Sequence, residues 1–259
     1  MTMYLRQVCL VAQKLEPAIV ALNSVLGIER CHVDPGVGKW GLENTLMAVG
    51  TNFLEVVAPI EENTAGGRYL DRRGGNGGYI LVCQVDSHIH QDQCRSNAAS
   101  LDVRVAFHSD RDHYHLMQLH PADLNNAMWE IDWDDRAEID GVWEPAGGNA
   151  WKDHMRSDVT TDLTGVELQS DDPQRDAKQW GAIAGITVEQ SADGFRLLMA
   201  NGELRFVPDR DGRSAGLAGV DLTVIERQRI LEAAGAIDGY RDDHCVELCG
   251  TRFYLQDRS

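Results

Sequence analysis

Three polar side chains lie in otherwise apolar stretches of the sequence and could do chemistry together. Glu55 lies in the stretch 52–59, Glu130 lies in the stretch 128–133, and Gln7 lies in the stretch 5–11. Two carboxylates and an amide oxygen are hard ligands, which suit Mg²⁺, Mn²⁺ or Fe²⁺, and an added histidine would suit Zn²⁺ or Ni²⁺. Such a metal would hold adjacent oxygens of a substrate and stabilise an enolate. A displaced carboxylate could then serve as a base.

Each of these residues also has an ordinary interpretation. Side chains alternate along a strand, so a core that takes Leu54 and Val56 would leave Glu55 in solvent. The same alternative holds for Glu130. A polar residue such as Gln7, early in an edge strand, needs no functional explanation.

The histidines are concentrated between residues 108 and 120. His113 and His115 are two positions apart in an expected strand, so they share a face and could chelate one metal. A solvated hairpin is the favoured interpretation of this pair. His120 lies on the turn that leads into the Glu130 strand. Its ring could complete a metal site, or it could cap the loop.

Apolar periodicity predicts the order β-α-β-β-β for the first 60 residues. A strand over 8–12 precedes a helix over 15–26, whose apolar side chains fall on one face. A short strand over 28–33 and a hairpin over 45–58 follow. The same order returns over 79–133. The sequence therefore predicts repeated modules.

The rest of the chain shows the same organisation less clearly. A third module begins near residue 163 and a fourth near residue 216. We expect a first domain over 1–133, a linker over 134–160 and a second domain over 161–259. The glycine-rich run 65–78 leads into a strand and lacks the lysine of a phosphate loop, so we expect it to be a flexible connection.

This repeated order, with an acid on each closing strand, resembles the vicinal oxygen chelate superfamily of glyoxalases, bleomycin resistance proteins and extradiol dioxygenases. The resemblance rests on the opening strand 5–11 with the helix after it, and on the closing strands 52–59 and 128–133. It extends to 160–259 in element order alone. It implies an α+β fold of tandem βαβββ modules, in two domains whose curved mixed sheets form cups.

The resemblance also implies a site. Carried over residue by residue, it gives Gln7, Glu55 and Glu130 as ligands of a divalent metal ion, with the two glutamates as catalytic residues. The opening strand 79–85 of the second module has no histidine where the family often has one. We therefore predict that His120 supplies the missing ligand.

The second half departs further from the family pattern. Its third module offers Glu203 as a closing acid, and Arg205 can occupy that place instead. We expect residues 161–259 to lack a metal.

The function implied by the resemblance is a divalent-metal-dependent lyase, isomerase or dioxygenase that uses Zn, Ni, Fe, Mn or Mg. Its substrate would be a small organic molecule with adjacent oxygens. The alternative is a non-catalytic protein of the bleomycin-resistance type, which binds or sequesters a small molecule in the same cup. Convergence of Glu55 and Glu130 on one cavity would favour the enzyme, because two unpaired buried anions repel each other.

Composition limits the partners. The 259 residues carry a formal net charge of −17, spread along the chain, which disfavours nucleic acid and anionic membranes. No apolar run approaches the ~20 residues of a spanning helix, and the start of the sequence lacks a secretory pattern. Six cysteines without a C-x-x-C pair do not resemble a disulfide framework. We expect a cytoplasmic protein, which could form a homodimer.

Overall fold

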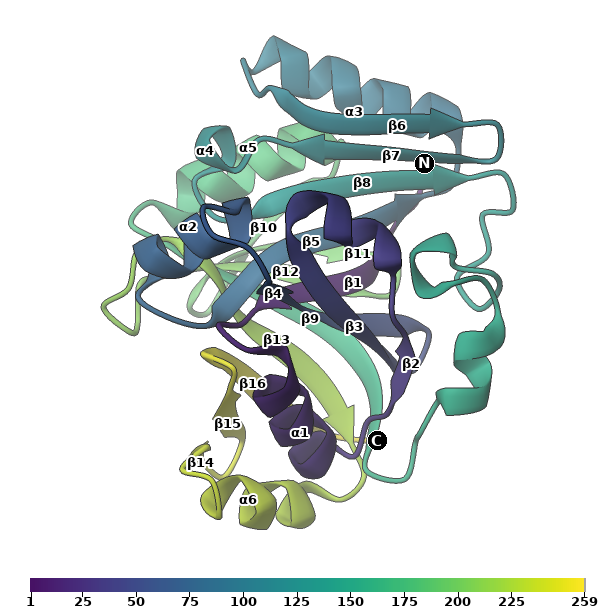
Figure 1. The fold of residues 1–259 in the computed structure, drawn as a ribbon. Helices are drawn as coiled ribbons and strands as arrows, with labels where there is room; N and C mark the ends of the chain where they lie inside the picture. Colours follow the sequence, from purple (N-terminus) through teal and green to yellow (C-terminus); the bar gives the residue numbers. More distant parts are fainter. Residues whose placement is uncertain (259) are drawn as a thin grey trace. The chain divides into compact units, whose positions relative to one another are not determined.

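Two eight-stranded mixed sheets dominate the computed structural model, which describes residues 1–258 (Figure 1). The first sheet has the order β2-β3-β4-β1-β5-β8-β7-β6. Its strands are β1 (Met3–Val11), β2 (Arg30–His32), β3 (Leu42–Val49), β4 (Asn52–Pro59), β5 (Gly77–Val85), β6 (Val105–Arg111), β7 (Tyr114–Leu119) and β8 (Met128–Asp134). The helices along this stretch are α1 (Leu15–Leu26), the 3-10 helix η1 (Pro35–Trp40), α2 (Ala65–Arg73), α3 (His88–Ser100) and α4 (Pro121–Leu124).

The second sheet repeats this arrangement with the order β10-β11-β12-β9-β13-β16-β15-β14. Its strands are β9 (Thr160–Ser170), β10 (Val188–Ser191), β11 (Gly194–Met199), β12 (Gly202–Pro208), β13 (Gly216–Val224), β14 (Tyr240–Asp242), β15 (Cys245–Leu248) and β16 (Thr251–Asp257). Its helices are α5 (Pro173–Ala184) and α6 (Arg227–Gly235), and the segment between the sheets holds η2 (Glu144–Ala146) and η3 (Ala150–His154). Neither strand order returns to its first member, so neither sheet closes into a barrel.

Each module joins its opening and closing strands in parallel. β1 pairs with β4, β5 with β8, β9 with β12, and β13 with β16. The closing strand of each module also belongs to an antiparallel hairpin. The order β-α-β-β-β therefore occurs four times, and the predicted α+β fold of tandem modules is confirmed.

The glycine-rich run was expected to be a flexible connection, and this expectation is wrong for its first half. Residues 65–73 form α2, because the Thr64 hydroxyl accepts a hydrogen bond from the Gly67 N–H at 2.9 Å and caps the helix. The helix ends at Gly74, whose φ of 75° is left-handed. The cap and the burial of Tyr69 and Leu70 together offset the low helix propensity of the two glycines.

The chain divides into two compact units, and each unit combines separate stretches. Unit 1 contains Met1–Arg6, Ile80–Glu138 and Gly165–Leu217, and unit 2 contains Gln7–Tyr79, Ile139–Thr164 and Ala218–Ser259. The predicted division at 134–160 separates the two sheets, whereas each compact unit draws strands from both. The two-domain division therefore stays a prediction.

Large aromatic side chains fill the core of unit 1. The Trp129 ring on β8 stacks on the Trp180 ring of α5 with 4.3 Å between centroids, and Phe206 on β12 meets Trp180 edge-on. Both tryptophans are fully buried. This packing joins the second and third modules.

Unit 2 has its own core. Phe53 on β4 meets Trp151 of η3 edge-on at 5.3 Å, and α1 packs on α6. Helix α1 ends at Gly27, which has a left-handed φ of 66°, and a Cβ there would lie 2.6 Å from Val159. A glycine is required at this turn because no larger residue fits. None of the helices in residues 1–258 has the length and apolarity that crossing a bilayer demands.

Candidate functional site

Glu55 lies in the middle of β4, which pairs with β1 on one side and with β3 on the other. Its Cα is opposite Cys9 on β1 and Leu46 on β3. Because side chains alternate, Gln7 and Asn44, each two residues from these partners, share the face of Glu55. The register thus brings one carboxylate and two carboxamides together from three adjacent strands.

The two carboxamides each donate to a different oxygen of Glu55. Gln7 Nε2 donates to Oε2 at 2.9 Å, and Asn44 Nδ2 donates to Oε1 at 2.6 Å. Glu55 is only 8% exposed. Burial raises the pKa of Glu55, and the hydrogen bonds from Asn44, Cys9 and Gln7 offset part of that rise. The result is a carboxyl group of fixed orientation with a pKa above its usual range.

Glu130 has different neighbours. Glu130, Asp132 and Asp134 alternate along one face of β8, and all three are buried. Gln118 Nε2 donates to Glu130 Oε2, and the Tyr114 hydroxyl donates to Asp132 Oδ2. Burial raises the pKa of Asp132 well above its usual range, and the nearby charge of Glu130 raises it further. A second buried carboxyl group therefore lies beside the predicted catalytic residue Glu130.

Asp134, the third acid of this row, has a structural role. Its Oδ1 accepts from the backbone N–H groups of Arg136 and Ala137, and its Oδ2 accepts from Gln84 Nε2 at 2.8 Å. It holds the turn that follows β8.

His120 caps a helix, as one of its two interpretations predicted. It is the N-cap of α4, and its Nδ1 accepts from the Ala122 N–H at 3.2 Å. Arg104 Nη2 lies 3.5 Å from the same nitrogen. In the pair His113 and His115, His113 is exposed, and the His115 ring packs edge-on against Trp133 at 5.0 Å.

Each of the four predicted ligands makes hydrogen bonds within the protein. Within residues 1–258, no group of three or more His, Cys, Asp or Glu side chains could hold one. Both oxygens of Glu55 accept N–H groups, and the His120 Nδ1 faces a backbone donor. The assignment of Gln7, Glu55, His120 and Glu130 as ligands stays a prediction.

Asn44 and Asp132 were not predicted as site residues. Both carry a periodic signal, because Asn44 is two residues from the buried Leu42 and Leu46, and Asp132 is two residues from Glu130. A polar residue in phase with a buried face is the observation that identifies them.

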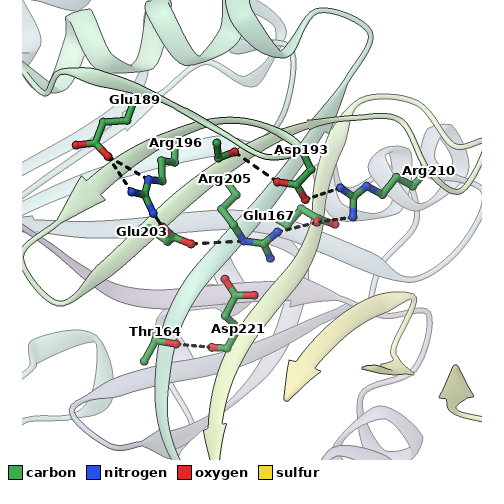
Figure 2. Close-up of polar contacts among 10 residues, drawn as sticks. Thr164, Glu167, Glu189, Asp193, Arg196, Glu203, Arg205, Arg210 and Asp221 are labelled. Carbon is green, nitrogen blue, oxygen red and sulfur yellow. Dashed lines mark hydrogen bonds and ion pairs between the residues drawn. The ribbon is translucent and has the colours of Figure 1, made fainter. Parts of the chain in front are cut away.

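In the third module, Arg205 is paired directly with an acid on the opening strand. Arg205 on β12 is opposite Glu167 on β9, and its Nη1 lies 3.0 Å from Glu167 Oε2. Figure 2 shows Arg210 reaching the same carboxylate, at 3.6 Å, while it also pairs with Asp193. Farther along the face, Arg196 bridges Glu189 and Glu203. Opposite charges are closely matched in this network.

A separate cavity in unit 1 contains none of the predicted site residues. Its volume is about 590 Å³. It is lined by Leu101, Ala122, Asp123, Asn125, Arg175, Asp176, Lys178 and Gln179. Two acidic and two basic side chains line the cavity, so its charge favours neither anionic nor cationic ligands.

Comparisons with known proteins identify the fold. No family model and no curated protein matches this sequence. A hypothetical protein from Staphylococcus aureus superimposes with a TM-score of 0.65 at 10% identity, over 100% of both chains. A mutant of 4-hydroxymandelate synthase from Streptomyces coelicolor superimposes with a TM-score of 0.63 at 13% identity, over 91% of this chain and 75% of that one. Methylmalonyl-CoA epimerase from Mycobacterium tuberculosis matches 51% of this chain and 87% of its own, with a TM-score of 0.43 and 24% identity.

The synthase is a member of the vicinal oxygen chelate superfamily. Its likeness covers nearly the whole of this chain, and the repeated module order agrees with it. The chain therefore has the vicinal oxygen chelate fold, as the motifs of its first half predicted.

Proposed function

We propose that this chain, with its vicinal oxygen chelate fold, is an enzyme that acts on a small organic molecule with adjacent oxygens, and that Glu55 moves the proton. One observation supports this above others. Glu55 is buried, its two oxygens are held by separate amide donors, and burial raises its pKa. Strongly perturbed carboxyl groups are characteristic of catalytic positions.

The physical argument concerns the match between pKa and working pH. A free glutamate, with a pKa of about 4.3, is too weak a base at neutral pH to remove a proton next to a carbonyl. Burial raises the pKa of Glu55, and a raised pKa makes its carboxylate a stronger base. Among the expected reactions, those of lyases and isomerases include such a proton transfer.

Glu130 belongs to the same proposal as a second catalytic carboxyl group. Whether it acts with Glu55 is measured by a double-mutant cycle of E55Q, E130Q and the double variant. Residues that act on one reacting centre give non-additive losses of kcat/KM, whereas independent residues give additive free energies.

The test of the proposal is proton exchange in D₂O. The purified protein is incubated with a panel of small 2-oxo acids and 2-hydroxy carbonyl compounds, and NMR follows the loss of the C–H signal. We expect exchange with at least one compound, and a loss of about 10²–10⁴-fold in E55Q, the usual contribution of a general base. E43Q is the matched control, because Glu43 is exposed on the neighbouring strand β3.

Two outcomes would overturn the proposal. Exchange that E55Q leaves intact would remove Glu55 from the chemistry. Tight binding of a compound without any exchange would favour the non-catalytic sequestration protein instead.

The remaining expectations concern metal, assembly and location. Elemental analysis, with the exchange assay repeated after EDTA treatment and after metal addition, tests dependence on a divalent metal. Light scattering tests the homodimer, and imaging of a tagged chain tests the cytoplasmic location.

A further inference from the structure

A chain of hydrogen bonds connects the segment between the two sheets to Glu55. The Trp143 indole Nε1 donates to Gln7 Oε1 at 3.3 Å, and Gln7 Nε2 donates to Glu55 Oε2 at 2.9 Å. We propose that Trp143 is a positioning residue, whose indole N–H fixes the direction of the Gln7 amide and hence the donor that Glu55 receives. All three residues belong to unit 2.

The argument depends on the polarity of the groups. An indole N–H can only donate, whereas a carboxamide has one accepting end and one donating end. Because Trp143 occupies the oxygen of Gln7, the NH₂ group of Gln7 must face the opposite way. That direction leads to Glu55.

The same arrangement, an N–H group bonded to a carboxamide oxygen, occurs on the other side of Glu55. The backbone N–H of Asp34, which is also only a donor, bonds to Asn44 Oδ1 at 3.0 Å. Asn44 Nδ2 then donates to Glu55 Oε1. Both carboxamides are thus oriented with their donors toward Glu55 and their oxygens toward a fixed N–H group.

The reversed Gln7 amide is disfavoured at both ends. It would place an oxygen against the Glu55 carboxylate and an NH₂ group against the indole N–H. Gln7 is 5% exposed and Trp143 is fully buried, so water cannot compensate for either contact. The observed orientation turns the amide oxygen away from Glu55, and the two side chains therefore do not form a chelating pair.

The backbone holds Trp143 in place. Trp143 and Gly148 exchange two backbone hydrogen bonds, at 2.9 and 3.0 Å. Between them Gly147 has a left-handed φ of 72°, and a Cβ there would lie 2.4 Å from the His32 ring. This tight turn against β2 keeps the indole at a fixed position, as a positioning role requires.

The test compares two buried tryptophans of this segment. W143F keeps a six-membered aromatic ring but loses the indole N–H that donates to Gln7. W151F is the matched control, because Trp151 is equally buried and its indole donates to the Gly141 carbonyl at 3.2 Å. The readout is hydrogen exchange of the Gln7 side-chain amide in ¹⁵N-labelled protein, with the signal assigned by its loss in Q7L.

We expect the Gln7 amide to exchange about ten-fold faster in W143F, the scale of one lost hydrogen bond. We expect no change in W151F. Unchanged exchange in W143F would overturn the proposal, and so would equal acceleration in both variants, because that would show a role in packing alone.

Q7L provides a second measurement if W143F fails to fold. It should accelerate exchange of the Trp143 indole proton and leave that of Trp151 unchanged, and equal protection of both protons would contradict the proposal. The kinetic consequence rests on the proposed function, where W143F should lower kcat with KM nearly constant. The amide readout needs no activity, so a failure of the proposed function is distinguishable from a failure of this inference.

Discussion

Glu55 and Glu130 both lie on closing strands, yet their surroundings differ in charge. Glu55 is held by two neutral amide donors. Glu130 accepts a hydrogen bond from the Gln118 amide and has the buried carboxyl group of Asp132 as its neighbour. The same module can therefore hold an acid in two ways, either by supplying N–H donors or by placing a second acid beside it.

The difference begins two residues farther along each strand. Val57 follows Glu55 on the same face of β4, and Asp132 follows Glu130 on the same face of β8. Both are buried. The two modules therefore differ in charge at this position, which is apolar beside Glu55 and acidic beside Glu130.

The first prediction makes Val57 acidic, like Asp132 in the second module. V57D would place a second buried acid beside Glu55, as in the second module but without the donating hydroxyl of Tyr114. We expect a loss of about 3 kcal/mol or more in the free energy of unfolding at pH 7, the scale of an uncompensated buried charge. Urea denaturation measures it. V57N is the control for polarity without charge, and equal stability of the two variants would refute the charge argument.

The second prediction removes the neighbouring acid of Glu130. Asp132 has a raised native pKa, so the folded protein binds its proton more tightly than the unfolded chain, and stability falls as pH rises between the two pKa values. This fall begins near pH 4, the ordinary value for aspartate, and amounts to about 1.4 kcal/mol for each unit of pKa difference.

D132N should abolish that fall and keep an acceptor for the Tyr114 hydroxyl. The stability of D132N relative to the wild type should therefore increase with pH above about 4. The measurement is urea denaturation of both proteins over a pH series. A stability difference that does not change with pH would show that Asp132 titrates normally.

The third prediction concerns His120 and has the smallest effect. As the cap of α4, His120 should contribute about 1 kcal/mol of stability, which H120A would remove without changing metal content. The predicted role as a ligand requires the opposite result, a loss of bound metal at constant stability. H113A is the control, because His113 is exposed. Thermal unfolding and elemental analysis of the three proteins distinguish the two roles.

The sequence predicted the fold well because the modules repeat one order of periodic elements. Strand alternation and the helix that ends at Gly27 are local signals, and their order along the chain predicts the topology. Helix α2 was missed because it depends on the cap at Thr64 and on the burial of Tyr69 and Leu70, which offset two glycines.

The site was harder to predict, because its contacts depend on strand register. Gln7 and Glu55 were predicted to share a site, and the structure places them within hydrogen-bonding distance. Asn44 and Trp143 come from a middle strand and from the segment between the sheets, where no family motif points to them. The orientation of each amide depends on donors distant in the sequence, which pattern analysis cannot supply.

The ionisation of Glu55 tests the central claim most directly. In protein labelled with ¹³C at glutamate Cδ, the Glu55 signal is the one that E55Q removes, and its shift can be followed from pH 3 to pH 9. We predict a midpoint above about 4.3, the ordinary glutamate value, because burial outweighs the hydrogen bonds from Asn44 and Gln7. A midpoint at or below that value would contradict the assignment of Glu55 as the proton-transferring group.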